Sequence, residues 1–293
     1  MNYSEVYALK QRRIEEKLGG FFLGQNDYED LYSAMRYSLL AGGKRLRPIL
    51  VMSFCEAVGG DVDDAMNAAA AIEMIHTYSL IHDDLPCMDD DDYRRGRLTC
   101  HRVYGENMAV LAGDALLTAA FRVLAETENV AAERVLRCLA LLAAAAGEDG
   151  MVAGQVMDLH GEGQHLDEAA LRRMYAGKTG ALIYAACTMG AILGGGSEAQ
   201  IQAAGEYARA LGIAFQIRDD MLDVIGTQEE LGKPIGSDEG NDKSTFVSLL
   251  GLEQCGTLVS SETEKAIAAL ACGLFTDTDF LRELALGLVD RKK

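Results

Sequence analysis

The sequence predicts an all-α fold, a single antiparallel bundle of roughly ten helices around a large central cavity. Only three prolines interrupt the 293 residues, at Pro48, Pro86 and Pro234, so long stretches can be helical. Alanine and leucine are abundant and strand-like alternation is scarce. No linker rich in Pro or Ser and no fixed-period repeat divides the chain, so we expect residues 1–293 to form one domain.

Apolar residues at helical spacing indicate individual helices. They are Leu31, Met35 and Leu39 in one segment and Leu136, Leu139, Ala140 and Ala143 in another. Residues 65–81 and 130–146 are apolar on most faces, so we expect both helices to be central. Residues 179–197 carry no charge over nearly a membrane-spanning length. Their content of Ala, Gly, Thr and Ser favours a tightly packed buried helix.

The overall charge limits the classes of partner. The chain has 27 Lys and Arg against 45 Asp and Glu, a formal net charge of −18. An acidic balance argues against general binding to nucleic acid or to anionic membranes, so an anionic substrate must be held by local cations. Seven scattered cysteines without a CxxC pair indicate reduced thiols. The N-terminus has no apolar core of signal-peptide length, so we expect a cytoplasmic protein without stable membrane insertion.

An acid cluster follows an apolar run in "YSLIHDDLPCMDDDDYRRGRLTCH", where six aspartates lie between Asp83 and Asp92. On an uninterrupted helix, Asp83 and Asp89 would point to different sides. Pro86 disfavours helical geometry at the residue before it, so we expect the helix to end there and the chain to turn back. Asp83 and Asp89 can then meet at one Mg²⁺ ion, with Asp84 as a further ligand. Asp90, Asp91 and Asp92 have no assigned role.

A second acid cluster, "DDMLD", contains Asp219, Asp220 and Asp223. Asp219 and Asp223 are four residues apart and share one face of a helix, where like charges are unfavourable unless solvent or a cation faces them. Apolar neighbours place this pair at the rim of a core and favour the cation. A solvated acidic loop is the alternative for either cluster alone. The spacing does not match a calcium loop, and two clusters that each follow an apolar helix favour metal binding.

Basic residues near these clusters suggest what the metal would hold. Lys44 and Arg47 in "GGKRLRP" are three residues apart beside a predicted helix N-terminus, a position that favours anions. The other candidates are Arg45, Arg94, Arg95, Lys178 with Thr179 in "GKTG", Lys233 and Lys243. Any one of them alone would be an ordinary surface base. Together they suggest two polyanion pockets, one bridged by metal and one purely basic.

These motifs resemble the trans-isoprenyl diphosphate synthase family, most closely its bacterial-type farnesyl diphosphate synthases. The matching blocks, in order, are "GGKRLRP", "SLIHDDLPCMDDDDYRRG", "GQVMDL", "GKTGALI", "GIAFQIRDDMLDVIG" and "LGKPIGSDEGNDKST". The similarity spans about Leu31 to Glu253. Six ordered motifs at plausible spacing make the resemblance specific.

The resemblance implies a role for each candidate residue. Asp83 and Asp89 would bind two Mg²⁺ ions, and Asp219, with Asp223 as a helper, would bind a third; Mn²⁺ is an alternative metal. The residues implied to contact the diphosphate of an allylic substrate are Arg94, Lys178 and Lys233, with Lys243 nearby. Those implied to hold isopentenyl diphosphate without metal are Lys44, Arg47, His76 and Arg95. Thr179 and Gln216 would face the allylic carbocation. Apart from the resemblance, His76 and Gln216 would be ordinary hydrogen-bonded residues of a helical core.

The resemblance also suggests the length of the product. Tyr78 and Ser79 precede Asp83 by five and four residues, so a hydrocarbon tail growing away from the metals must pass them. In the family, an aromatic residue at the fifth position goes with a C15 product, which implies farnesyl diphosphate. The alternative is a geranylgeranyl diphosphate (C20) synthase, in which Tyr78 packs sideways.

Two further alternatives share this fold. A class I terpene cyclase has no need of Lys44, Arg47 and Arg95 for a second diphosphate. A non-catalytic subunit of a prenyl synthase would have lost ligands, whereas both acid clusters here are intact. The family habit of forming homodimers leads us to expect a homodimer.

Overall fold

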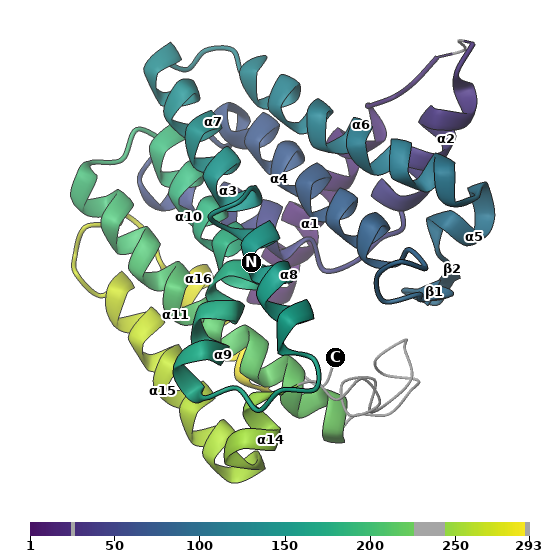
Figure 1. Ribbon diagram of the computed structural model, residues 1–293. Coiled ribbons are helices and arrows are strands. Elements are labelled where there is room, and N and C mark those ends of the chain that lie inside the picture. Colours follow the sequence, from purple (N-terminus) through teal and green to yellow (C-terminus); the bar gives the residue numbers. More distant parts are fainter. Residues whose placement is uncertain (25–26, 226–243, 291–293) are drawn as a thin grey trace.

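The computed structural model describes residues 1–24, 27–225 and 244–290 (Figure 1). Lys233 and Lys243, two of the predicted phosphate contacts, lie outside the described residues. The helices of the first half are α1 (Tyr3–Gly19), α2 (Glu29–Leu39), α3 (Leu46–Ala57), α4 (Val62–Asp83), α5 (Cys100–Tyr104), α6 (Glu106–Ala125) and α7 (Ala132–Ala146). Those of the second half are α8 (Met151–Gly161), α9 (Glu168–Tyr175), α10 (Ala181–Leu193), α11 (Glu198–Ile225), α14 (Phe246–Leu250), α15 (Leu252–Leu270) and α16 (Asp279–Asp290).

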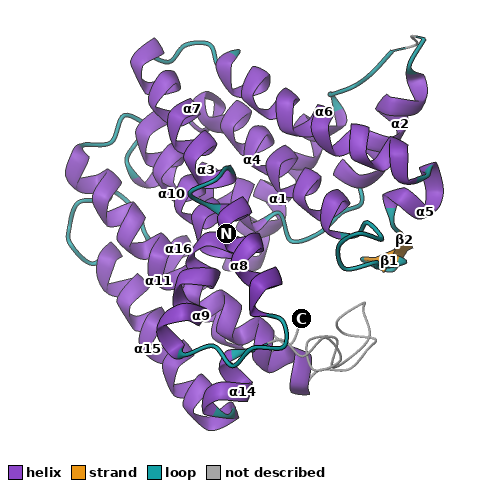
Figure 2. Ribbon diagram, in the orientation of Figure 1, coloured by secondary structure: helices purple, strands orange, loops and turns teal. Residues whose placement is uncertain are grey.

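The described part of the chain is all-α, as the sequence predicts, apart from one hairpin of two-residue strands, β1 (Tyr93–Arg94) and β2 (Arg97–Leu98) (Figure 2). A single π-helical turn (Ala176–Gly180) joins α9 to α10. Several helices begin at side-chain caps that satisfy their first backbone N–H groups. Asn2 and Glu5 form a capping box on α1, and Asp61 caps α4.

Helices α3, α4 and α10 form the centre of the bundle, with α6 packed along α4, and α11 packed between α10 and α15 (Figure 1). Helix α4 is buried along most of its length, so its predicted central position is confirmed. The prediction for residues 130–146 is half wrong. They form helix α7, but α7 lies at the surface, and Leu136 is 67% exposed. Its inward face consists of Val135, Cys138, Leu142, Ala145 and Ala146 instead.

The break at Pro86 is confirmed. Helix α4 ends at Asp83, and the chain then folds back so that the Asp89 amide donates to the Asp83 carbonyl oxygen at 2.9 Å. The Asp90 amide donates to the Leu85 carbonyl at 3.1 Å, which closes the turn. The backbone of Asp89 therefore lies against the end of α4, as the metal-site hypothesis requires.

Two helical segments are long and apolar enough to cross a membrane by length and composition, Glu106–Ala125 and Glu168–Leu193. In the second segment, 67% of the most apolar stretch of 18 residues is buried inside the protein. All but two of the thirteen residues of α10 are buried. Residues 179–197 thus contain the packed internal helix that their small side chains predict.

Candidate active site

One cavity of about 480 Å³ brings together many of the predicted site residues. It opens between the start of α3, the middle of α4, strand β1, the π-helical turn and the second half of α11. The predicted residues that line it are Lys44, Arg45, Arg47, His76, Arg94, Arg95, Thr179, Gln216 and Asp219. Segments separated by as much as 175 positions in the sequence therefore meet at one site.

The wall formed by α3 and α4 is strongly cationic. Arg47 lies in the first turns of α3, and its Nε is buried without a hydrogen-bond partner among the described residues. Burial lowers the pKa of Arg47. Burial, together with the positive charges of Arg47 and Arg95, lowers the pKa of His76 well below its usual value. His76 is therefore neutral near pH 7, and an anion in the cavity would supply the acceptor that Arg47 lacks.

Arg95 joins the hairpin to the loop before α3. Its Nη1 donates to the Gly42 carbonyl oxygen, and its guanidinium lies against Gly43. A Cβ on Gly43 would come within 2.7 Å of the Arg95 Cζ, and Gly43 has a φ of +123°, so only glycine is accommodated without strain. The position of Arg95 beside Lys44 thus depends on the two glycines of "GGKRLRP".

Helix α8 contacts two residues of the predicted set that do not line this cavity, Asp83 and Lys178. Gln155 Nε2 donates to Asp83 Oδ1 at 2.8 Å, and Lys178 Nζ is 2.6 Å from Asp158 Oδ2. Gln155 and Asp158 are three residues apart on one face of the helix. Sequence reasoning assigned them no role, although "GQVMDL" was one of the matching blocks.

The π-helical turn presents Lys178 and Thr179. A Cβ on Gly154 of α8 would lie 2.0 Å from the Lys178 backbone nitrogen, so α8 contacts this turn backbone to backbone. Thr179 Oγ1 donates to Gln216 Oε1 at 2.7 Å, which joins the turn to α11. Single π-helical turns inside helices are frequent at functional sites, because the extra residue redirects side chains.

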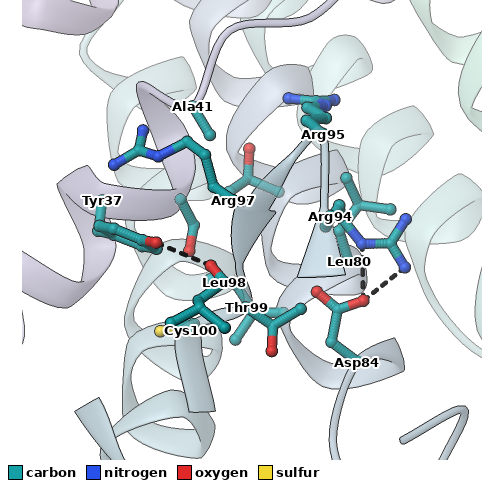
Figure 3. A pocket seen from close by; sticks show the side chains of 13 residues that line it. Tyr37, Ala41, Leu80, Asp84, Arg94, Arg95, Arg97, Leu98, Thr99 and Cys100 are labelled. Atoms are coloured by element: carbon teal, nitrogen blue, oxygen red, sulfur yellow. Dashed lines mark hydrogen bonds and ion pairs between the residues drawn. The ribbon is translucent and has the colours of Figure 1, made fainter. Parts of the chain in front are cut away.

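Asp84 pairs with Arg94 (Figure 3). Arg94 Nε and Nη2 lie 2.6 and 2.5 Å from Asp84 Oδ1, and the side chain of Asp84 is 5% exposed. Burial raises the pKa of Asp84 to about 6, although Arg94 opposes the shift. In Figure 3 the neighbouring Arg95 lies at the end of the hairpin and points away from Asp84. The carboxylate of Asp84 is thus engaged by a cation of the site.

Two of the aspartates without an assigned role also pair with arginines. Asp91 Oδ2 lies 3.7 Å from Arg94 Nη2, and Asp92 Oδ1 lies 3.0 Å from Arg102 Nε. Asp90 is exposed and has a φ of +53°, a left-handed conformation that aspartate tolerates better than most residues. Part of the acid cluster therefore organises the hairpin.

The second acid cluster lies on the continuous helix α11, so Asp219 and Asp223 share a face, as their spacing predicts. Asp219 is half-buried and lines the cavity, and Asp223 is buried. Asp220 is also buried, and its Oδ2 accepts from the Tyr175 hydroxyl at 2.8 Å and from the Phe246 amide at 2.9 Å. Asp220 therefore joins α11 to α9 and α14.

The donor set fits Mg²⁺ shared with a diphosphate. Among the described residues, no three side chains of His, Cys, Asp or Glu form a ready-made metal site. Instead, carboxylates stand in two groups at the ends of α4 and α11, next to a cationic cavity. Mg²⁺ commonly binds one or two carboxylates, keeps several waters and takes its remaining ligands from phosphate. Asp83, Asp89, Asp219 and Asp223 are suited to that arrangement.

Tyr78 and Ser79 lie one turn or more before Asp83 on α4 but do not line the 480 Å³ cavity. Tyr78 is 7% exposed, and its ring contacts His82 edge to face with centroids 5.7 Å apart. Ser79 Oγ donates to the carbonyl oxygen of His76 at 2.9 Å. Their influence on chain length stays a prediction.

The fold and the two groups of carboxylates beside a cationic cavity define an enzyme class that handles prenyl diphosphates. Residues 28–271 match the polyprenyl synthetase family, and the chain belongs to it. The family is magnesium-dependent.

Known members of the family differ in the product that their names give. The chain is 51% identical to a farnesyl diphosphate synthase of Geobacillus stearothermophilus, over 83% of this chain and 82% of that protein. It is 53% identical to the chloroplastic geranylgeranyl pyrophosphate synthase 11 of Arabidopsis thaliana, over 76% of this chain and 64% of that protein. A geranyltransferase structure from Helicobacter pylori, complexed with magnesium and isoprenyl diphosphate, matches with a TM-score of 0.86 and 32% identity, over 99% and 97% of the two chains.

Proposed function

We propose that the protein condenses isopentenyl diphosphate with dimethylallyl and then geranyl diphosphate, head to tail, to give farnesyl diphosphate. The observation that carries this proposal is that one cavity has two kinds of anion-binding wall. The start of α3 contributes Lys44, Arg45 and Arg47 to the cavity wall, and the nearby Glu73 is paired with Arg45. The opposite side contains Asp219, and Asp83 lies three residues after the lining residue Leu80 on α4. The two sides could therefore bind two diphosphates, one through metal at the acidic side and one through cationic side chains alone.

The metal-free wall would bind isopentenyl diphosphate. Lys44 and Arg47 approach from the N-terminus of α3, and Arg95 approaches from the hairpin. His76, which is neutral near pH 7, can donate one hydrogen bond to a phosphate oxygen without adding charge. A terpene cyclase would not require this second diphosphate pocket.

The acidic side would bind the allylic diphosphate. Asp83, Asp89, Asp219 and Asp223 would hold Mg²⁺, with Arg94 and Lys178 as direct contacts, and Lys233 and Lys243 are proposed as further contacts. Bound Mg²⁺ would neutralise the diphosphate and make it a better leaving group. Thr179 and Gln216, which are hydrogen-bonded to each other, present oxygens toward the site of the allylic carbocation. The double bond of isopentenyl diphosphate attacks that carbocation, and the proton that is then lost goes to the departing diphosphate.

We further propose a C15 product. Tyr78 stands on α4 about 7.5 Å before Asp83 along the helix axis, given a rise of about 1.5 Å per residue. It is buried, so a tail that grows along α4 would meet a filled position. The competing candidate is a C20 product, which the mixed names of the relatives support.

One assay tests both parts of the proposal. Purified protein is incubated with isopentenyl and dimethylallyl diphosphates, with and without Mg²⁺, and the products are separated by chain length. We expect metal-dependent release of diphosphate and C15 as the main product. Tyr78→Ala should shift the product toward C20. Absence of metal-dependent release would exclude the synthase, and an unchanged length in the variant would exclude Tyr78 as the determinant.

We also propose that the enzyme is a homodimer in the cytoplasm. Large apolar side chains are exposed on three neighbouring helices of the bundle, α6, α7 and α8. They include Val110, Leu111, Leu136, Val152 and Val156. Apolar side chains exposed in number on neighbouring helices are typical of interaction surfaces. Sedimentation of the purified protein at several concentrations measures the oligomeric state directly, and a monomer throughout would contradict the proposal.

A further inference from the structure

Arg45, the central cation of "GGKRLRP", is withdrawn from solvent. Its side chain is 0% exposed, and its guanidinium makes four hydrogen bonds. Nε and Nη2 donate to the two carboxylate oxygens of Glu15 on α1, at 2.7 and 3.2 Å. Nη1 donates to Glu73 of α4 at 2.7 Å, and Nη2 also donates to the Leu39 carbonyl oxygen at 2.7 Å. Arg45 thus connects α1, α4 and the end of α2.

The backbone at Arg45 requires such support. Its φ is +51°, in the left-handed region that is unfavourable for any residue with a Cβ. Arg45 is also the residue immediately before the first turn of α3, and no side chain there caps the helix. The segment with this turn runs along the cavity, because Lys44, Arg45, Leu46 and Arg47 all line its wall.

One stripe of α1 holds the same loop at three successive residues. The Gln11 amide donates to the Gly43 carbonyl oxygen at 2.8 Å, and the Tyr7 hydroxyl donates to the Lys44 carbonyl oxygen at 2.6 Å. Glu15 completes the stripe through Arg45. Tyr7, Gln11 and Glu15 are four residues apart in turn, so they lie above one another on one face of the helix.

We propose that Glu15, through the ion-pair cluster Glu15–Arg45–Glu73, is a positioning residue for the metal-free diphosphate pocket. The cluster fixes the loop so that Lys44 and Arg47 face one diphosphate together. Buried ion pairs often contribute little net stability compared with well-packed apolar residues. The defined direction of the guanidinium fork is what an apolar side chain could not supply. This inference rests on the proposed function.

The test uses Glu15→Gln, because Glu15 does not line the cavity and its side chain is 33% exposed, so the variant should fold. KM is measured separately for isopentenyl diphosphate and for the allylic substrate. A misplacement of about 1 Å can reduce rates about 100-fold. We expect KM for isopentenyl diphosphate to rise roughly tenfold, with KM for the allylic substrate changed less than about twofold. Arg45→Lys, which keeps the charge but loses the fork, should shift the same KM in the same direction.

Glu262→Gln is the matched control. Glu262 is buried, pairs with Arg172 and Lys265 at 3.1 Å each, and lies in a groove between α11 and α15 away from the cavity. A purely structural role of Glu15 predicts the same behaviour in both variants, a lower Tm with both KM values unchanged. That result would overturn the inference.

Calorimetric titration with isopentenyl diphosphate in the absence of metal separates this inference from the proposed function. If the wild type binds this ligand but no condensation occurs, the proposed function fails. The inference then depends only on how the variants' affinities for isopentenyl diphosphate compare with that of the wild type. Weaker binding in Glu15→Gln but not in Glu262→Gln supports it. Equal affinity in all three proteins, or no binding by the wild type, overturns it.

Discussion

The two acid clusters of the protein each begin with an Asp-Asp pair, Asp83 with Asp84 and Asp219 with Asp220. In both pairs the two aspartates differ from each other in the same way. In each pair, the first aspartate is a proposed Mg²⁺ ligand; Asp83 is hydrogen-bonded to Gln155 on α8, and Asp219 lines the cavity. The second is buried and makes contacts that hold other elements. Successive residues of a helix point about 100° apart, so two adjacent carboxylates cannot both face one ion.

The pairs differ in what the second aspartate holds. Asp84 stands at the end of α4 and pairs with Arg94, a cation that itself lines the cavity. Asp220 lies within α11 and accepts hydrogen bonds from neutral donors, the Tyr175 hydroxyl, the Phe246 amide and, at 3.4 Å, the Gln216 side-chain amide. We therefore expect loss of Asp84 to affect substrate binding and loss of Asp220 to affect stability.

The largest effects should come from the first member of each pair. Asp83→Asn and Asp219→Asn should each lower kcat/KM by about 10²–10³, because each would remove a charge that holds Mg²⁺ at the reacting diphosphate. The Mg²⁺ concentration needed for half-maximal rate should rise, with Tm close to that of the wild type. Activity within about fivefold of the wild type in either variant would contradict the assignment.

Asp220→Asn should act mainly on stability. The Tyr175 hydroxyl and the Phe246 amide both donate to Oδ2, so an amide oxygen there keeps both bonds only if its N–H₂ group replaces Oδ1, which accepts from Gln216 Nε2 at 3.4 Å. Two N–H₂ groups then face each other, and an unsatisfied buried group costs about 1–3 kcal/mol. Urea denaturation should show a loss of that size in the free energy of unfolding. The Mg²⁺ dependence of the remaining activity should be that of the wild type, and a shifted dependence would instead make Asp220 a ligand.

Asp84→Asn tests whether this carboxylate positions Arg94 or binds metal. Without the ion pair, Arg94 loses its orientation, so KM for the allylic substrate should rise by roughly tenfold, the cost of one charge-assisted hydrogen bond. The Mg²⁺ dependence should not change. A shift like that of Asp83→Asn would place Asp84 among the metal ligands, as the sequence motif suggests.

The smallest effect concerns pH. The pKa of Asp84 is raised from its ordinary 3.8 to about 6, mainly because the carboxylate is buried. Between these values the folded protein binds a proton that the unfolded chain has lost, so Asp84 makes stability fall as pH rises from about 4 to about 6. Unfolding free energies measured over this range should decline less in Asp84→Asn than in the wild type. Parallel curves would contradict the burial argument.

Features that depend on neighbouring residues were predictable. The turn at Pro86 and the shared face of Asp219 and Asp223 follow from local backbone geometry, and the structure has both. The convergence of Lys44 and Arg47 at a helix start follows in the same way, although α3 begins at Leu46, two residues before Pro48.

Features that depend on distant partners were not predictable from patterns. The hydrogen bond from Gln155 to Asp83 joins residues 72 positions apart, and nothing in the spacing of either indicates the other. Helix α7 was misplaced because its outward face is as rich in Leu and Ala as its inward face. That ambiguity in the sequence is resolved only by the helices that pack on one side of it.

The sequence by itself determined the helical class, the breaks between helices, the kinds of charge gathered at each break and, through its motifs, the family. Backbone propensity and side-chain chemistry are local properties, so they can be read along the chain. Only the tertiary structure decided which member of each charged group serves the site. Arg45 and Asp84 are engaged in ion pairs inside the protein, because a charge removed from water is tolerated only beside a partner, and that partner is supplied by another helix or by the hairpin.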